Sequence, residues 1–428
     1  MRFMKLAIAL VTLGVMLGGV TARAAENTIK VGILHSLSGT MAISETTLKD
    51  AMLMFIDEQN KRGGLLGQKL EAVVVDPASD WPMFAEKARA LLTQDKVAAV
   101  FGCWTSVSRK SVLPVFEEAN GLLFYPVQYE GQESSRNVIY TGAAPNQQAI
   151  PAVDYLLKEM GIKRFVLAGT DYVFPRTANK IVEAYLLRQG VAQDDIMINY
   201  TPFGYADWQS IVADIKRFGS AGRKTAVIST INGDANVPFY KELVNQGITA
   251  DLIPVMAFSV GEEELSGIDT RPLAGHLAAW NYFMSVETPE NEAFIEKWHA
   301  FVNDPKRVTN DPMEAHYIGF NLWVKAVEKA RSTDVDDVLK AIVGLEVPNL
   351  TGGKARLLPN HHITKPVFIG EITEEGQFQV VWQTPGEIPG DAWSDYLPES
   401  QDLEADWTAP LNCGNYNLKT KTCGGSGN

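Results

Sequence analysis

The chain has 428 residues, of which 46% are hydrophobic, with 51 acidic residues against 38 basic ones. A net charge of −13 argues against binding to nucleic acid or anionic lipid, because phosphate contacts need clustered Lys and Arg. A chain of about 400 residues exceeds what one hydrophobic core usually serves, so we expect two lobes.

The first residues have the pattern of a secretory signal peptide. Arg2 and Lys5 precede the apolar run 6–22, and Ala22-Arg23-Ala24 fits a small-x-small cleavage site. The run falls short of the roughly 20 residues that cross a bilayer, so we expect a signal peptide at 1–24 rather than an anchor. Its removal leaves a net charge of about −16. No later segment is apolar enough to span a membrane, so the exported chain is expected not to be membrane-spanning.

Apolar runs and amphipathic stretches alternate along the chain, as in parallel sheets with crossover helices. The first part predicts strands at 28–34, 70–75, 97–101 and 122–125, with helices at 47–60, 83–94 and 106–120. The middle predicts strands at 163–169, 195–200, 224–229 and 252–257, with helices at 176–190, 208–218 and 237–247. The last third predicts a strand at 276–279, helices at 291–301, 315–330 and 335–344, and a hairpin of 367–372 and 378–382. This order predicts an α/β fold with two doubly wound parallel sheets.

Small polar residues follow the strand 97–101, where a helix begins. Helix amide N–H groups and the hydroxyls of Thr105 and Ser106 can converge there on one carbonyl or carboxylate oxygen. Trp104 adds a flat apolar wall. The next strand ends in a similar way, with the residues Tyr125, Val127 and Gln128. Two adjacent strand ends therefore predict a site for a small, uncharged, planar molecule, although ordinary packing of Trp104 and Tyr125 stays open.

Several short motifs carry a family resemblance. In the first part they are Lys30–Gly39, Gly102-Cys-Trp-Thr-Ser106, Arg109-Lys110, Tyr125-Pro126, Tyr129-Glu-Gly131 and Ala144-Pro-Asn-Gln147. Later ones are Gly169-Thr-Asp-Tyr172, Pro175-Arg176, Ala279-Trp-Asn-Tyr-Phe283 and Asp311-Pro-Met-Glu-Ala315. Together they resemble the amide- and urea-binding branch of the branched-chain-amino-acid-type periplasmic binding proteins. The match is most similar to urea-binding members of ABC transporters.

The resemblance implies a type I periplasmic-binding-protein fold, in which the chain crosses between the lobes three times and the ligand lies between them. We place lobe 1 at 25–145 and 278–346, lobe 2 at 146–277 and 347–410, and a tail at 411–428. The implied function is capture of urea or a short-chain amide in the periplasm and delivery to an ABC permease, without a cofactor or a metal. An amide-sensing regulator that acts through a protein partner is the alternative.

Site residues follow from the same resemblance. Trp104, Ser106, Tyr125 and Tyr172 match the pocket of the amide sensor, whereas Val127-Gln128 and Phe174 depart from it. The wider family implies further contacts at Asn232, Asp234, Ser259 and Met313. Trp104, Tyr172 and Trp280 are expected to enclose the ligand plane. Asp234 has a second interpretation, as a cap at the start of a helix.

The three cysteines receive separate interpretations. Cys413 and Cys423 lie ten residues apart in the polar tail, which predicts a disulfide in an exported protein. A zinc site would need further Cys or His ligands close by. Cys103 follows a strand and is expected to be a small packing residue.

The sequence does not contain the motifs of the common enzyme classes that we compared. Ser106 does not lie in Gly-x-Ser-x-Gly, Cys103 has no neighbouring His, and there is no phosphate-binding Gly-x-x-x-x-Gly-Lys-Ser/Thr. His361-His362 is the only pair of adjacent histidines, and adjacent loop residues rarely chelate one metal together. We therefore expect a binding protein and not an enzyme.

Overall fold

The computed structural model describes residues 28–398 and 400, together with the backbone of three short tail strands. Those strands are β17 (Ala405–Trp407), β18 (Cys413–Asn417) and β19 (Thr422–Gly424). The predicted signal peptide 1–24 lies outside the described residues. The side chains of Cys413 and Cys423 also lie outside the described part, so their disulfide stays a prediction.

The first lobe is built on a five-stranded sheet in the order β2-β1-β3-β4-β5, in which all the pairs are parallel. Its strands are β1 (Ile29–Leu34), β2 (Leu70–Val75), β3 (Ala99–Gly102), β4 (Leu123–Tyr125) and β5 (Val138–Tyr140). The helices between them are α1 (Ala42–Lys61), α2 (Trp81–Ala90) and α3 (Ser106–Glu118). The predicted strands are confirmed within two residues at each end. The strand β5 is not predicted from the sequence, because three apolar residues show no periodicity.

The second lobe is built on a seven-stranded sheet in the order β15-β14-β10-β9-β8-β6-β7. Its parallel strands are β6 (Arg164–Thr170), β7 (Ile196–Thr201), β8 (Thr225–Thr230), β9 (Val255–Ala257) and β10 (Leu277–Trp280). Its helices are α4 (Ala149–Lys158), α5 (Val173–Arg188), α6 (Gln209–Gly219), α7 (Asn236–Asn245) and the short α8 (Glu262–Leu265). The predicted hairpin is confirmed as the antiparallel pair β14 (Phe368–Ile372) and β15 (Phe378–Gln383). The helix α4 was not predicted.

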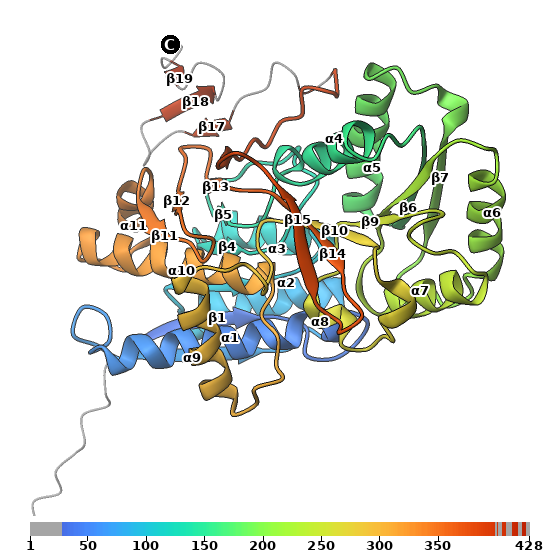
Figure 1. The fold of residues 1–428 in the computed structure, drawn as a ribbon. Helices are drawn as coiled ribbons and strands as arrows, with labels where there is room; N and C mark the ends of the chain where they lie inside the picture. Colours follow the sequence, from blue (N-terminus) through green and yellow to red (C-terminus); the bar gives the residue numbers. More distant parts are fainter. Residues whose placement is uncertain (1–27, 399, 401–404, 408–412, 418–421, 425–428) are drawn as a thin grey trace, which may run out of the picture.

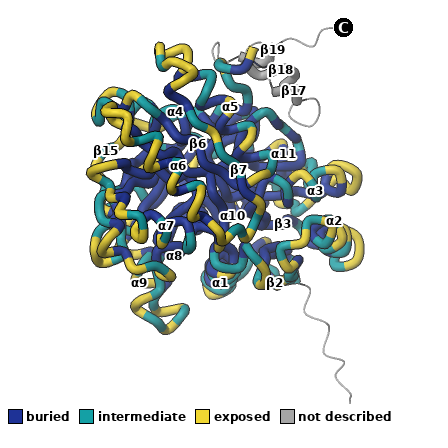
Figure 2. Tube along the Cα trace, turned by 90° about the vertical axis from the view of Figure 1, so that its right-hand side faces the viewer, coloured by how far each residue is buried: buried dark blue, intermediate teal, exposed yellow. Residues whose placement is uncertain are grey.

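Three later helices return to the first lobe and cover its sheet (Figure 1). They are α9 (Pro289–Val302), α10 (Asp311–Ala330) and α11 (Val335–Ile342). Their apolar faces join the sheet in one core, whereas the second sheet has a core cluster on each face. The buried interior runs through both lobes, with exposed residues on the outer turns (Figure 2). The two lobes lie side by side, with α1 and α10 in one and α5, α6 and α7 in the other.

Strand pairing corrects one of the predicted lobe boundaries, and core packing corrects another. β10 pairs with β9 and β14, so residues 278–280, which we placed in lobe 1, belong to lobe 2. The small sheet of β11 (Glu346–Pro348) and β12 (Lys354–Arg356) packs on the core of lobe 1, as do Leu357 and Ile363. Residues 347–363 therefore belong to lobe 1 and not to lobe 2. Both errors arose because a boundary depends on which strand or core a segment joins, and local sequence does not show this.

One buried amide joins the three segments that cross between the lobes. Asn281 Nδ2 donates to the carbonyl oxygens of Gln147, at 2.9 Å, and of Pro366, at 2.6 Å. Gln147 Nε2 in turn donates to the carbonyl oxygens of Ile363 and Ile388. The 3-10 turn at Pro145–Gln147, the residue after β10 and the residues before β14 are thereby held together. We infer that the lobes are connected by one hydrogen-bonded unit.

Asn281→Ala should lower the free energy of unfolding by about 1–3 kcal/mol, because the buried carbonyl oxygen of Gln147 and the partly buried one of Pro366 lose their donor. Denaturation by guanidinium chloride, followed by far-ultraviolet circular dichroism, measures this change. Asn321→Ala is the matched control, since Asn321 Nδ2 makes its hydrogen bond to Tyr317 of the same helix. Equal effects of the two substitutions would contradict a special role for Asn281.

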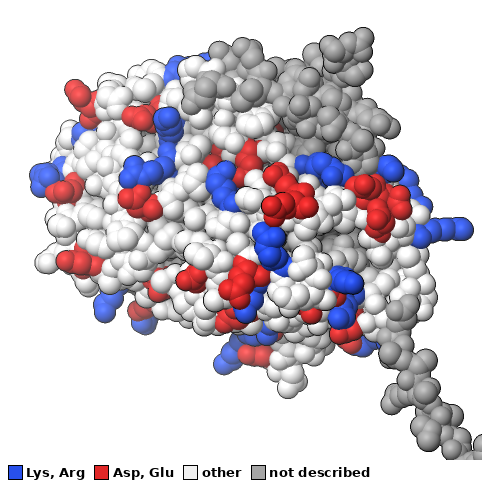
Figure 3. Space-filling model, turned by 180° about the vertical axis from the view of Figure 1, so that it is seen from behind, with Lys and Arg blue, Asp and Glu red and all other residues white. Residues whose placement is uncertain are grey.

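Exposed charges of the two signs are interspersed on the face that Figure 3 shows. Arg217 and Asp214, whose charged groups lie 2.7 Å apart, are one exposed pair of opposite charges in the protein. Among the described residues that Figure 3 draws on this face, acidic and basic side chains are mixed, and the basic ones form no broad surface for phosphate contacts.

Candidate functional site

The carboxyl ends of the parallel strands locate the candidate site. In open α/β sheets, ligands bind at these ends, at the point where the strand order reverses. In lobe 1 this point lies between β1 and β3, and in lobe 2 it lies between β6 and β8. The residues that follow these strands include Trp104 in lobe 1, and Tyr172 and Asn232 in lobe 2. Three of the regions that we predicted as strand-end contacts, at Trp104, Tyr172 and Asn232, thus lie at the reversal points.

The two lobes contact each other directly around these strand ends. Gln128 Nε2 donates to Ser259 Oγ across the lobes at 2.7 Å. The backbone N–H of Asp234 donates to the carbonyl oxygen of Thr40 at 3.2 Å. The Ser44 hydroxyl on α1 donates to Glu264 Oε1 on α8 at 2.5 Å. These contacts describe a closed arrangement, in which residues between the lobes are shielded from solvent.

The predicted residues of lobe 1 lie close together and are buried. Trp104, Thr105, Ser106, Tyr125, Val127 and Gln128 are each at most 3% exposed. Thr105 caps α3 by accepting from the N–H of Ser108 at 3.1 Å, which explains why the helix begins there. The Tyr125 hydroxyl donates to the carbonyl oxygen of Trp104 at 2.5 Å and so links two neighbouring strand ends.

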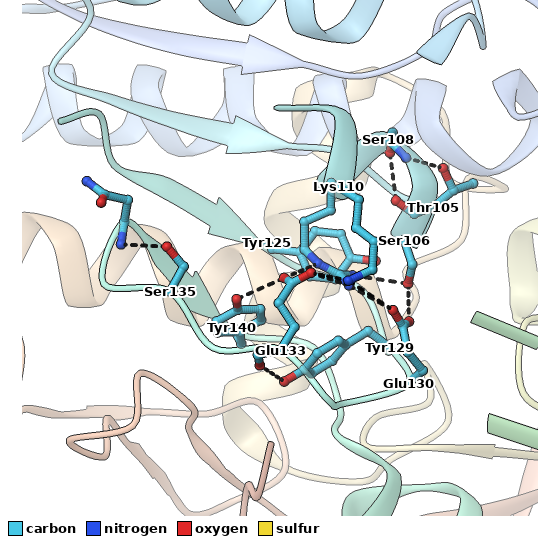
Figure 4. A network of polar contacts seen from close by, with 12 residues as sticks. Thr105, Ser106, Ser108, Lys110, Tyr125, Tyr129, Glu130, Glu133, Ser135 and Tyr140 are labelled. Atoms are coloured by element: carbon cyan, nitrogen blue, oxygen red, sulfur yellow. Dashed lines mark hydrogen bonds and ion pairs between the residues drawn. The ribbon is translucent and has the colours of Figure 1, made fainter. Parts of the chain in front are cut away.

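A buried ion network around Ser106, Glu130 and Glu133 lies beside these residues (Figure 4). Arg109 makes the hydrogen bonds that join its members. Its guanidinium is 0% exposed and donates to Glu133 Oε1 at 2.7 Å, to Glu130 Oε1 at 3.1 Å and to Ser106 Oγ at 3.1 Å. The same guanidinium lies 4.7 Å from the ring centre of Tyr125. Burial would raise the pKa of Glu133, but Arg109 and the nearby Lys110 lower it to about 2. Every nitrogen of the guanidinium therefore has a carboxylate or hydroxyl partner.

The network changes the interpretation of Ser106. The Ser106 hydroxyl donates to Glu130 Oε2, so it is not free to donate to a ligand oxygen as we expected. Glu130 and Glu133 were given no role in the sequence analysis. The sequence does contain a signal for this network. Two carboxylates follow β4, and Arg109 and Lys110 follow β3. Adjacent parallel strands bring these groups together.

The predicted residues of lobe 2 differ from one another in how far they are buried. Tyr172 is half-buried, and its ring centre lies 4.8 Å from that of Phe203. Asn232 is buried, and its backbone N–H bonds to Thr170 at the neighbouring strand end. Asp234 is exposed at the contact with Thr40, and Ser259 bonds to Gln128 as described. These residues surround the region between the lobes, and their contact with a ligand stays a prediction.

Trp280 and Met313 have structural partners within their own lobes. The Trp280 indole N–H donates to the carbonyl oxygen of Val260 at 2.8 Å, and the ring packs in a core cluster of lobe 2. Met313 is buried in the core of lobe 1, where Thr47 donates to its sulfur at 3.8 Å. Packing accounts for these two residues, and a role in ligand binding stays a prediction.

The helix α8 carries buried carboxyl groups near the contact between the lobes. Glu262 Oε1 accepts from the N–H of Met284 at 2.7 Å. Burial raises the pKa of Glu262 to about 8, and the like charges of Glu264 and Asp311 add to this. Burial also raises the pKa of Glu263 to about 7. Protonation of these groups therefore favours the folded state over the unfolded chain.

Stability should fall as the pH rises from about 5 to about 8, because the Glu262 carboxyl ionises in the unfolded chain before it ionises in the folded protein. One such group contributes a slope of at most about 1.4 kcal/mol per pH unit. Glu262→Gln should remove this contribution, as measured by guanidinium chloride denaturation at several pH values. The exposed Glu118 gives the control, since Glu118→Gln should keep the wild-type slope. A wild-type slope in the Glu262 variant would contradict the assignment.

The comparisons with known proteins agree with this geometry. Residues 29–399 match the family model described as the periplasmic binding protein domain.

The chain belongs to the periplasmic binding protein family.

Proteins of this family bind solutes, and this chain is a solute-binding protein and not an enzyme. Its type I periplasmic-binding-protein fold is confirmed by the solved structures that it matches. In the part of the chain that the structure describes, no helix has the length and apolar character needed to cross a membrane. No group of three or more His, Cys, Asp or Glu side chains among these residues could hold a metal ion.

Two curated relatives show different extents of similarity. The Leu/Ile/Val-binding protein homolog 6 of Brucella melitensis is 23% identical over 374 residues, which cover 86% of this chain and 93% of that protein. The limonene hydroxylase of Geobacillus stearothermophilus is 30% identical over 116 residues, which cover 27% of this chain and only 21% of that protein. The periplasmic binding protein match therefore extends over far more of the chain.

Two solved structures share the fold. The solute-binding protein of an ABC transporter from Rhodopseudomonas palustris, in complex with p-hydroxybenzoic acid, has a TM-score of 0.74 at 20% identity, covering 85% of this chain and 98% of that one. The branched-chain amino acid transporter substrate-binding protein of Streptococcus pneumoniae, in complex with isoleucine, has a TM-score of 0.67 at 18% identity, covering 85% and 100%. At these identities the likeness shows the fold alone.

Proposed function

We propose that this periplasmic binding protein captures urea or a short-chain amide and delivers it to an ABC permease. The observation that carries the proposal is the full engagement of Arg109. Arg109 and Lys365 are the buried Arg and Lys side chains of the described residues. Arg109 is engaged by Glu130, Glu133 and Ser106. Lys365 donates to the carbonyl oxygen of Thr141 and lies 3.6 Å from Glu314.

This arrangement favours an uncharged ligand over a carboxylate. The bound ligands named for the similar structures, p-hydroxybenzoic acid and isoleucine, both carry a carboxyl group. Burial of a carboxylate without a free cationic partner would leave its charge uncompensated, at a cost of several kcal/mol. Urea and short amides need no such partner, because they are neutral and planar.

Unpartnered polar atoms support the same ligand class. The Trp104 indole N–H and the amide oxygen Gln128 Oε1 are buried without a hydrogen-bond partner in the described structure. One can donate to a ligand carbonyl oxygen, and the other can accept from a ligand N–H group. Each such group that a ligand satisfies avoids a cost of about 1–3 kcal/mol.

Isothermal titration calorimetry against urea, acetamide, formamide and thiourea tests the proposal. We expect saturable binding of at least one of these ligands by the purified protein. Absence of binding to all four, together with binding of a carboxylate ligand, would overturn it. We also propose that residues 1–24 are a cleaved signal peptide that directs the protein to the periplasm. An N-terminus at Met1 in a cytosolic fraction would instead support the sensor alternative.

Replacing Trp104 or Tyr172 with Ala should weaken urea binding by about 1–3 kcal/mol, because we propose that these rings hold the ligand plane from opposite lobes. Calorimetric titration of each variant measures the change. Phe301 on α9 is an exposed aromatic residue, so Phe301→Ala is the control and should bind as the wild type does. If both site variants fold and bind with unchanged affinity, the rings do not hold the ligand.

A further inference from the structure

Glu45 is a buried carboxyl group that the sequence analysis did not include in the site. It lies in the first turn of α1 and is 0% exposed. Its Oε2 accepts from the backbone N–H of Ser36 at 2.9 Å and lies 3.1 Å from His35 Nδ1. Its other oxygen, Oε1, is buried without a hydrogen-bond partner in the described structure. An unpaired buried acceptor of this kind is costly unless a ligand or a water satisfies it.

The carboxyl group lies at the strand ends where lobe 1 is expected to bind its ligand. Ser36 follows β1, and Cys103 follows β3, to which β1 is paired. The N–H of Cys103 donates to the carbonyl oxygen of Leu34 at 2.8 Å, so the two strand ends are in contact. Glu45 is close enough to Cys103 to add to the effect of burial in raising the pKa of its thiol. The next residue is Trp104, with its unpartnered indole N–H.

Two histidines hold Glu45 in place. His35 Nε2 lies 2.8 Å from His316 Nε2 on α10. Burial, together with His35, lowers the pKa of His316 well below its usual value, so His316 is neutral. A neutral His316 can donate to His35, and His35 can then donate to Glu45 Oε2 through Nδ1. This series of hydrogen bonds orients Oε2 of Glu45 and leaves Oε1 available.

Contacts between the two lobes beside Glu45 shield its Oε1 from water when the lobes are closed. Ser44 is the preceding residue, and its hydroxyl bonds to Glu264 of lobe 2. Closure of the lobes therefore covers this turn of α1. A ligand N–H group trapped there would face an acceptor that water can no longer satisfy.

We propose that Glu45 Oε1 accepts a hydrogen bond from an –NH₂ group of the ligand, and that it makes the site selective for primary amides over the isosteric carboxylic acids. The inference rests on the proposed function, since it names the protein group that accepts a hydrogen bond from the ligand nitrogen. A carboxylate ligand would place its own negative oxygen against Glu45, whereas an amide places an N–H donor there. Acetamide and acetate have nearly the same shape and separate the two cases.

The test compares acetamide with acetate in the wild type and in Glu45→Gln, by calorimetry at pH 7. We expect the ratio of acetamide affinity to acetate affinity to fall at least about 10-fold in the variant, which corresponds to loss of one charge-sensitive contact. A purely structural Glu45 would weaken both ligands together and keep the ratio. Glu264→Gln is the matched control, because Glu264 is also a buried carboxyl group near the cleft, but both of its oxygens have partners. Its ratio should stay at the wild-type value.

A crystal structure of the wild type with urea tests the same contact without a variant. A urea nitrogen within about 3.2 Å of Glu45 Oε1 supports the proposal. A water molecule on Oε1, with urea elsewhere, overturns it. If the wild type binds no urea or amide, the proposed function itself fails; if it binds them with an unchanged ratio in Glu45→Gln, only the role of Glu45 fails.

Discussion

Arg109→Met should lower the free energy of unfolding by about 3–5 kcal/mol, the range found when one partner of a buried ion pair is removed. The substitution leaves the carboxyl groups of Glu130 and Glu133 buried without their main cation. It also removes the guanidinium from the rings of Tyr125 and Tyr129, each 4.7 Å away. Denaturation by guanidinium chloride measures the loss.

Lys110→Met is the matched control for this effect. Lys110 also pairs with Glu133, at 2.7 Å, but its side chain is 39% exposed. Solvent weakens such a pair, so we expect a loss below about 1 kcal/mol. Comparable losses in the two variants would show that the network is not a buried, mutually dependent unit.

Urea or a two-to-three-carbon amide should bind at least about 100-fold more tightly than leucine, a gap of roughly 2.7 kcal/mol. Leucine brings a carboxylate and an ammonium group into a region where Arg109 is already engaged. Its side chain would also have to fit beside Trp104 and Tyr125, both buried in the closed arrangement. Urea brings neither charge nor side chain.

Competition titrations at fixed pH measure this discrimination. Benzoate should be included in the same titrations, because one of the similar solved structures holds p-hydroxybenzoic acid. Leucine or benzoate bound as tightly as every amide would overturn the ligand assignment and leave the fold assignment intact. Formamide and acetamide bound alike would show that the site reads the amide group and not the carbon chain.

Much of the fold could be predicted because its determinants are local. The strands β1, β2 and β8 are short apolar runs, and the helices between them show amphipathic spacing, so their places follow from the residues themselves. Boundaries between lobes could not be obtained in this way. β10 belongs to lobe 2 only because it pairs with β9 and β14, which are separate in the chain.

The residues of the candidate site could likewise be predicted only in part. The sequence by itself determined that Trp104 and Thr105 follow one strand and that Tyr125 and Gln128 follow the next. Because neighbouring parallel strands end at the same edge of a sheet, these two sets of residues were expected to lie together. Only the tertiary structure decided that Ser106 is engaged by Glu130 and that Arg109 is fully paired. The physical reason is that a buried charge is defined by its partners in space.

Glu45 shows this most clearly. In the sequence it is an acidic residue near the start of a helix, a position usually explained by the helix dipole. In the structure His35 and Ser36 bind one of its oxygens, and His316 on a helix more than 250 residues later supports His35. The environment of its remaining oxygen depends on packing between α1, α10 and the strand ends, and such packing is encoded in no single segment of the chain.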